Sequence, residues 1–138
     1  MLKNILITLL AVLLLSFMWQ TNNQPCFSDY SNTYEVYEYS NSSSASIQPV
    51  SHSEYKFAFN KYGESCQIEK SVFSVNDILN SFSANLIKVE KLAHGTSYYA
   101  YSPNIKYRIQ LQGQYINLHV FDGEDSLKIG SPIIFGSY

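Results

Sequence analysis

The chain has 138 residues and a net formal charge of −2; only 14% of its residues are charged, while 46% are hydrophobic and 15% aromatic. This length suits one domain with its own core. Nine Lys and Arg against eleven Asp and Glu exclude the clustered cations that an ordinary nucleic-acid surface needs, so we expect no nucleic-acid partner. The composition also excludes collagen, a heptad coiled coil and a cysteine-dense scaffold.

The chain begins with an apolar segment, Ile5–Trp19, preceded by Lys3. A positive start followed by an apolar run is typical of a signal peptide, which predicts export. The run has about 15 residues, fewer than the ~20 that cross a bilayer core comfortably. No small-x-small cleavage site follows it. Residues 1–22 are therefore expected to be a cleaved signal or an uncleaved anchor, and a buried core helix is the third alternative.

An exported protein is either secreted or held on the outer side of the cytoplasmic membrane. In the second case we expect membrane contact only through residues 5–19. Two cysteines, Cys26 and Cys66, follow the apolar segment, and in an oxidising compartment they are a candidate disulfide. The alternative is a pair of unrelated thiols.

The stretch 23–53 is expected to be a Tyr- and Ser-rich leader and linker that precedes the folded domain, residues 54–138. Residues 20–29 are polar and predicted to be disordered. Thr33–Tyr39 is rich in β-formers and predicts a strand. Asn41–Ser46 reads as a Ser-rich linker that Pro49 extends.

The first part of the domain reads as a β-hairpin. Tyr55–Phe59 alternates aromatic residues with Lys56 and Ala58, which predicts a strand. The sequence Lys61–Glu64 contains a glycine and predicts a turn. Ser65–Lys70 is the expected second strand.

One helix is predicted, beginning after Ser74. The Ser74 hydroxyl can cap the helix, and Asp77 lies three residues further on, at the positive end of the helix. The residues at helical spacing form one apolar face: Val75, Ile78, Leu79 and Phe82. Asn85 is the expected left-handed residue that ends the helix.

The rest of the chain reads as β-structure. The Gln112-Gly113 pair is a two-residue hairpin signal. One helix packed on an antiparallel meander predicts an α+β fold. The expected strands are Leu86–Leu92, Ser97–Tyr101, Lys106–Leu111, Gln114–Phe121, Leu127–Ile129 and Ile133–Phe135.

No catalytic, cofactor or metal motif stands out. Two cysteines and three scattered histidines match no metal-ligand spacing, and no G-x-S-x-G sequence is present. We therefore expect neither a cofactor nor a metal, and favour a non-catalytic domain that binds an unknown partner at the cell envelope. The alternative is a small extracytoplasmic hydrolase that pairs His94 or His119 with a nearby serine.

Tyrosines are the most unusual feature of the predicted strands. Tyr98, Tyr99 and Tyr101 lie on one strand, where alternate side chains point to opposite faces. A tyrosine ring combines an apolar body with a polar tip, which suits contact with a partner. These three are the candidate binding surface, although tyrosine is also simply a good strand former.

From Ile78 to the end, the order of motifs resembles the C-terminal part of the YwmB family of exported Gram-positive proteins. The motifs are the apolar helix Ile78–Ala84, the strand Asn117-Leu118-His119-Val120, and Gly130-Ser131-Pro132-Ile133-Ile134 before a terminal aromatic, Tyr138. The resemblance implies one half of a TATA-box-binding-protein-like fold and supplies no catalytic residue. Family members are longer, with room for two similar halves.

One short helix covers only part of a sheet of several strands. The predicted strand Gln114–Phe121 carries apolar residues on both sides, so neither side is expected to be fully wet. Either Thr33–Tyr39 folds back over the sheet, or a second chain covers it through self-association or a heteromeric contact.

Overall fold

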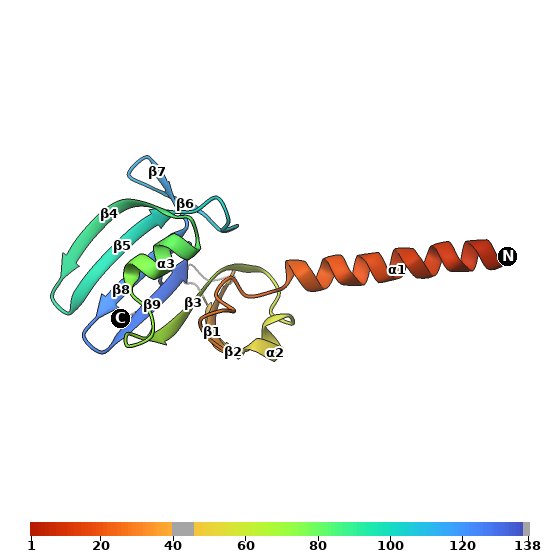
Figure 1. Cartoon of the computed structure of the whole chain (residues 1–138), viewed down its shortest axis with the longest axis horizontal. Helices are drawn as coiled ribbons and strands as arrows, with labels where there is room; N and C mark the ends of the chain where they lie inside the picture. The colour runs from red at the N-terminus through yellow and green to blue at the C-terminus, as the bar shows by residue number, and fades with distance from the viewer. Residues whose placement is uncertain (40–45, 137–138) are drawn as a thin grey trace.

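The computed structural model describes residues 1–39 and 46–136. It confirms the α+β class: helix α1 (Leu2–Asn22) leads into an antiparallel sheet that carries two short helices, α2 (His52–Tyr55) and α3 (Val75–Ser81) (Figure 1). The sheet has seven strands in the order β2-β1-β3-β9-β8-β5-β4. Their bounds are β1 Thr33–Glu38, β2 Ser46–Ser51, β3 Lys61–Glu69, β4 Asn85–Leu92, β5 Gly95–Tyr101, β8 Leu118–Gly123 and β9 Ser126–Ser131. Two further strands, β6 (Ile109–Leu111) and β7 (Gln114–Ile116), form a separate hairpin.

Helix α1 stands away from the sheet (Figure 1). It is apolar from Leu2 to Gln20, and none of that span is buried. This excludes the core-helix alternative, because a core helix would bury its apolar side chains against the domain.

The two faces of the sheet are covered by different segments. The inner face carries the core, including Val36, Ile68, Val120 and Ile129, under α3 and the segment that follows α1. Phe27 of that segment packs edge-on against Phe82 at the end of α3. On the outer face the C-terminal segment crosses the middle of the sheet, and its Ile134 is buried.

Part of the stretch 23–53, expected to precede the folded domain, belongs to the sheet. The predicted strand Thr33–Tyr39 is confirmed as β1, and β2 pairs with it at the sheet edge. Pro49 lies inside β2, exposed, which is compatible with an edge strand because its missing N–H costs no ladder bond there. Residues 40–45 of the predicted Ser-rich linker lie outside the described residues.

The prediction of a disordered segment over residues 20–29 is wrong. Helix α1 continues to Asn22, and both Pro25 and Phe27 are buried. The polar composition of the segment predicts disorder, but the burial of Pro25 and Phe27 is enough to hold the segment against the core.

The predicted hairpin of Tyr55–Phe59 with Ser65–Lys70 is also wrong. Tyr55 ends α2, and Lys61–Glu64 is the start of β3, not a turn. The glycine in this strand has a steric cause: a Cβ on Gly63 would lie 2.4 Å from the carbonyl oxygen of Ser131. A Cβ on Gly130 would likewise lie 2.8 Å from the side chain of Ile134. Both glycines give the C-terminal segment room to cross the outer face.

The predicted helix and its N-cap are confirmed as α3, but its predicted end at Asn85 is not. The Ser74 hydroxyl accepts a hydrogen bond from the Asp77 amide at 3.2 Å, and the Asp77 carboxylate accepts from the Ser74 amide at 2.9 Å. Ile78 and Leu79 are buried. The positive φ after the helix belongs to Ser83, at 50°, and Asn85 instead begins β4.

The β6–β7 hairpin confirms the Gln112-Gly113 turn, where φ is 50° and 85°. The predicted strand Gln114–Phe121 is divided at Asn117, so β7 pairs with β6 while β8 enters the main sheet. The Asn117 side chain bonds the backbone of Ser102 in both directions, at 2.7 and 2.6 Å. Ile133–Phe135, predicted as a strand, is the irregular segment that crosses the outer face.

The sheet is covered differently from either expectation. Thr33–Glu38 does not fold over the sheet but extends it sideways between β2 and β3. Inner-face coverage comes from α3, Phe27 and Tyr55, and outer-face coverage from the C-terminal segment. Leu86 and Val89 of β4 stay about half exposed, at 48% and 46%.

Candidate functional site

A hydrogen-bonded cluster around a buried carboxylate lies where α1 joins the domain. Its centre is Glu64 of β3, fully buried on the core face of the sheet. Carboxylate oxygen Oε1 accepts hydrogen bonds from the backbone amides of Cys26, at 2.5 Å, and Phe27, at 3.3 Å. The Tyr55 hydroxyl donates to Oε2. One strand, the α1 exit and α2 are therefore joined at a single side chain.

The sequence pattern does not reveal this site, because Lys61–Glu64 is predicted to be a turn. The sequence pattern that indicates such a site is a charged residue that alternates with apolar residues on one face of a strand. Position 64 alternates with Cys66 and Ile68, both buried, which places the carboxylate on the core side.

Burial sets the electrostatics of this site. It raises the pKa of Glu64, against the opposing effect of its hydrogen bonds and of Lys61 nearby. Burial lowers the pKa of Lys61, whose ammonium donates to the carbonyl of Ala58 at 2.5 Å and to that of Tyr55 at 3.2 Å. A cleft of about 250 Å³ opens beside Glu64, with Ile105, Lys106 and Tyr107 on its other side. Both carboxylate oxygens already have donors, so the geometry fits a structural clamp better than an acid–base catalyst.

The two cysteines flank this clamp as free thiols. The structure does not support the candidate disulfide between Cys26 and Cys66 and agrees with the alternative of two free thiols. Burial and the Glu64 charge raise the pKa of Cys26 to about 12 and also raise the pKa of Cys66. A thiol must ionise to act as a nucleophile, so both are poor nucleophiles at neutral pH.

One histidine of the hydrolase alternative, His119, does meet a serine, Ser97, on the outer face. The imidazole Nε2 lies 3.1 Å from the Ser97 hydroxyl, and Nδ1 accepts a hydrogen bond from the Ile134 amide at 3.1 Å. Because Nδ1 is the acceptor, Nε2 carries the proton and donates to the serine. A catalytic histidine must instead accept the serine proton, with Nδ1–H held by a carboxylate. This pair has the opposite polarity, and both residues are buried.

The other histidines lie elsewhere. His94 is exposed in the turn between β4 and β5. His52 begins α2, and its Nδ1 lies 3.3 Å from the Tyr34 hydroxyl. Across residues 1–39 and 46–136, no three His, Cys, Asp or Glu side chains are grouped to hold a metal ion.

The three tyrosines of the candidate binding surface are divided between the faces of the sheet. Tyr98 packs against the inner core. Tyr99 and Tyr101 alternate to the outer face, where the Tyr99 ring stacks on His119 at 4.4 Å between centroids. All three are half-buried. Tyr99 and Tyr101 are brought together, and Tyr98 is not.

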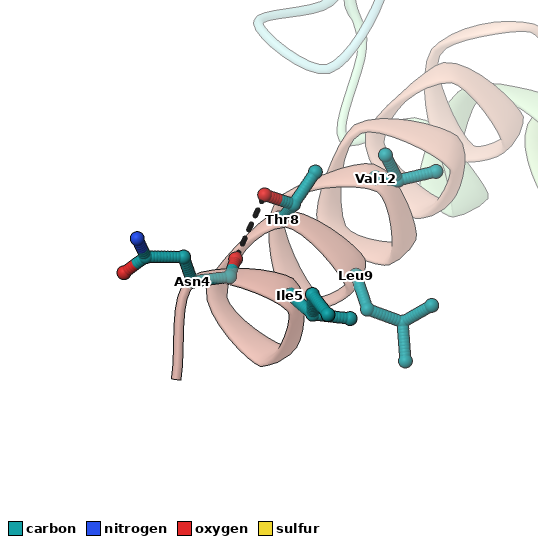
Figure 2. Close-up of a pocket in the computed structure, with 5 residues that line it drawn as sticks. All are labelled: Asn4, Ile5, Thr8, Leu9 and Val12. Atoms are coloured by element: carbon teal, nitrogen blue, oxygen red, sulfur yellow. Dashed lines mark hydrogen bonds between the residues drawn. The ribbon is translucent and has the colours of Figure 1, made fainter. Parts of the chain in front are cut away.

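A shallow hollow lies along the first turns of α1, lined by Asn4, Ile5, Thr8, Leu9 and Val12 (Figure 2). The Thr8 hydroxyl donates to the Asn4 carbonyl at 2.9 Å, within the helix itself. Ser16 donates to the Leu13 carbonyl in the same way, at 2.8 Å. With their hydroxyls bonded to their own helix, these residues fit an apolar environment.

Comparison with known proteins returned no matching family model, no matching curated protein and no matching solved structure.

We predict that Glu64→Ala and Glu64→Gln differ sharply in stability. Ala leaves the Cys26 and Phe27 amides without their acceptor, at a cost of roughly 2–4 kcal/mol. Gln keeps an oxygen acceptor and removes a buried charge, so its change is within about 1 kcal/mol. Urea unfolding in detergent measures both, with exposed Glu69→Gln as the control. Equal losses for Ala and Gln would contradict the acceptor role.

We predict that His119 makes stability depend on pH. Burial lowers its pKa to about 4, whereas an unfolded imidazole titrates near ~6.5. Between these values the unfolded chain binds more protons, so stability is full above about pH 6.5 and falls toward pH 4, by up to about 3 kcal/mol. Thermal unfolding from pH 7 to 4 measures the slope.

His119→Gln should flatten this slope, and His94→Gln, in the exposed turn, should leave it unchanged. A wild-type slope equal to that of His119→Gln would show that another group is responsible.

Proposed function

We propose that this protein is an exported, non-catalytic domain held at the outer face of the cytoplasmic membrane by an uncleaved α1, where its sheet binds a partner. The observation that carries the proposal is α1 itself. Its apolar span Leu2–Gln20 is wholly exposed. At 1.5 Å per residue these 19 residues reach about 28 Å, close to the ~30 Å hydrocarbon core of a bilayer.

The charge pattern supports an orientation with the domain outside. Lys3 and the amino terminus are the cations at the start of α1, and the next Lys or Arg in the chain is Lys56. Positive residues near a membrane helix stay on the cytoplasmic side, which favours export of everything that follows α1.

The junction favours an anchor over a cleaved signal. Pro25 and Phe27 are already buried in the domain, so only Asn23 and Gln24 link α1 to the core. No small-x-small sequence follows the apolar run. A cleaved signal is the alternative, and it leads to the same export with a secreted domain.

A binding role is supported by the apolar strip on β4. Leu86 and Val89 are half-exposed on the inner face, where α3 does not extend. Figure 1 places β4 and the β4–β5 turn at the end of the domain far from α1. Lys88 and Lys91 on this edge strand discourage pairing through the backbone, so a partner would contact the side-chain strip.

The hydrolase alternative has less support, because His119 donates to Ser97 rather than accepting its proton. The likeness to the YwmB family remains a prediction. Its motif residues Asn117 and Gly130 have structural roles, one tying β7 to a loop and the other making room for Ile134.

We predict that the chain remains full-length in the membrane fraction after alkaline extraction and that its domain is cleaved by protease added outside. Leu10→Arg with Leu13→Arg should release it, since each arginine at a helix centre costs about 2.5–3.5 kcal/mol of insertion energy. Val72→Arg, at an exposed position of the domain, is the control. A soluble cytoplasmic protein with an intact N-terminus would refute the proposal.

We predict that a photo-cross-linking residue at Val89 yields a specific adduct in intact cells, and that one at Val72 does not. Val72 is exposed to a greater extent, at 62%, but lies outside the β4 strip. An adduct with the mass of two copies of this chain would identify self-association. A single adduct of a different, higher mass than the chain would identify a heteromeric partner. Equal yields at the two positions would contradict a binding role for the strip.

A further inference from the structure

A second surface of the domain lies beside the point where α1 leaves it. Figure 1 shows α2 and the segment after it at the α1 end of the domain. Lys56, immediately after α2, lines a hollow together with His52 and with Trp19 and Gln20 of α1. If α1 crosses the bilayer as proposed above, this segment lies next to the lipid headgroups.

The distances agree with that placement. Trp19 is the last residue of the apolar run, where aromatic residues of membrane helices meet the interface. From Trp19 to Asn22 the helix rises about 4.5 Å, within the ~5–8 Å of headgroup region on each side of a bilayer. The domain begins within this depth, because Pro25 is already buried in it.

The exposed side chains of this surface suit a lipid interface. Among phenylalanines outside α1 in the part of the chain that the structure describes, Phe57 and Phe59 are the exposed ones, at 61% and 68%. The Lys56 ammonium lies 5.0 Å from the centre of the Phe57 ring. Exposed aromatic rings beside lysines are the combination by which peripheral segments enter an anionic lipid surface.

Further positive charge lies close by. Lys106, on the opposite side of the Glu64 cleft, is near enough to Lys61 to lower its pKa. The nearby carboxylates are Glu54, which accepts a hydrogen bond from its own N-cap, Ser51, and Glu38, which lies near Lys61, while Glu64 is buried. Lys56, Lys61 and Lys106 place three cations at this end of a chain whose overall charge is −2.

We infer that the segment Lys56–Phe59, with Lys106, docks on anionic phospholipid of the membrane that α1 crosses, placing Phe57 and Phe59 among the headgroups. Two consequences follow. The domain is held in one orientation, with the β4 strip directed away from the bilayer, and the strength of docking depends on lipid charge and on salt. This inference rests on the proposed function, because it requires α1 to be in the bilayer.

The test uses the full chain, reconstituted in vesicles whose lipids carry brominated acyl chains, which quench nearby tryptophan. Trp19, the single tryptophan, is replaced by Phe, and a new one is introduced as Phe57→Trp, as Phe59→Trp or as Leu92→Trp. Leu92 is 40% exposed at the β4–β5 turn, far from α1, and is the matched control. Having two docking-site variants guards against failure of one to fold.

On phosphatidylglycerol vesicles we expect quenching at positions 57 and 59 at least about twice that at 92, and a weaker effect on phosphatidylcholine or in ~0.5 M salt. Lys56→Gln with Lys106→Gln should reduce the lipid-charge dependence about fivefold or more. Equal quenching at 57, 59 and 92 would overturn the docking. Equal quenching on both lipids would overturn the role of the lysines.

The unsubstituted chain, with its native Trp19, tests the membrane anchor separately from the docking. Quenching of Trp19 without quenching at 57 and 59 refutes the docking alone. Absence of Trp19 quenching means that α1 is not in the bilayer, which refutes the proposed anchor.

Discussion

The carboxylate of Glu64 is the interaction on which the arrangement of this protein depends. It is buried on the core face of β3, and it accepts hydrogen bonds from the segment that follows α1 and from Tyr55 of α2. A buried charge costs free energy unless donors surround it, and the two backbone amides and the tyrosine hydroxyl offset that cost. The same bonds fix where α1 leaves the domain.

Water is excluded from the two faces of the sheet by different parts of the chain. The inner face has a core of aliphatic and aromatic side chains under α3 and Phe27. The outer face is closed at its centre by the C-terminal segment, whose amides bond His119 and the Tyr37 hydroxyl. His119 and the Tyr37 hydroxyl are thus hydrogen-bonded to the backbone of this one segment. Because His119 accepts that bond through Nδ1, it donates to Ser97 and does not accept the serine proton, so the histidine–serine contact is structural.

The proposed function divides the molecule along the direction of α1. Near the helix exit lie lysines and exposed phenylalanines, which suit lipid. At the opposite end lies the half-exposed β4 strip, which suits a protein partner. The link between α1 and the buried part of the domain has only two residues, so the two ends of the domain keep their positions relative to α1. A long flexible leader would let the domain turn freely.

The sequence by itself determined the apolar N-terminal helix, α3 with its Ser74–Asp77 cap, β1 and the Gln112-Gly113 hairpin, since each is encoded by local pattern or capping chemistry. Only the tertiary structure decided that Gly63 lies in a strand, because its reason is the backbone of Ser131, far away in sequence. The same holds for Glu64, whose partners are 38 and 9 residues distant, and for Pro49, tolerated because β2 is an edge. Contacts between segments, not local propensity, assign these residues their places.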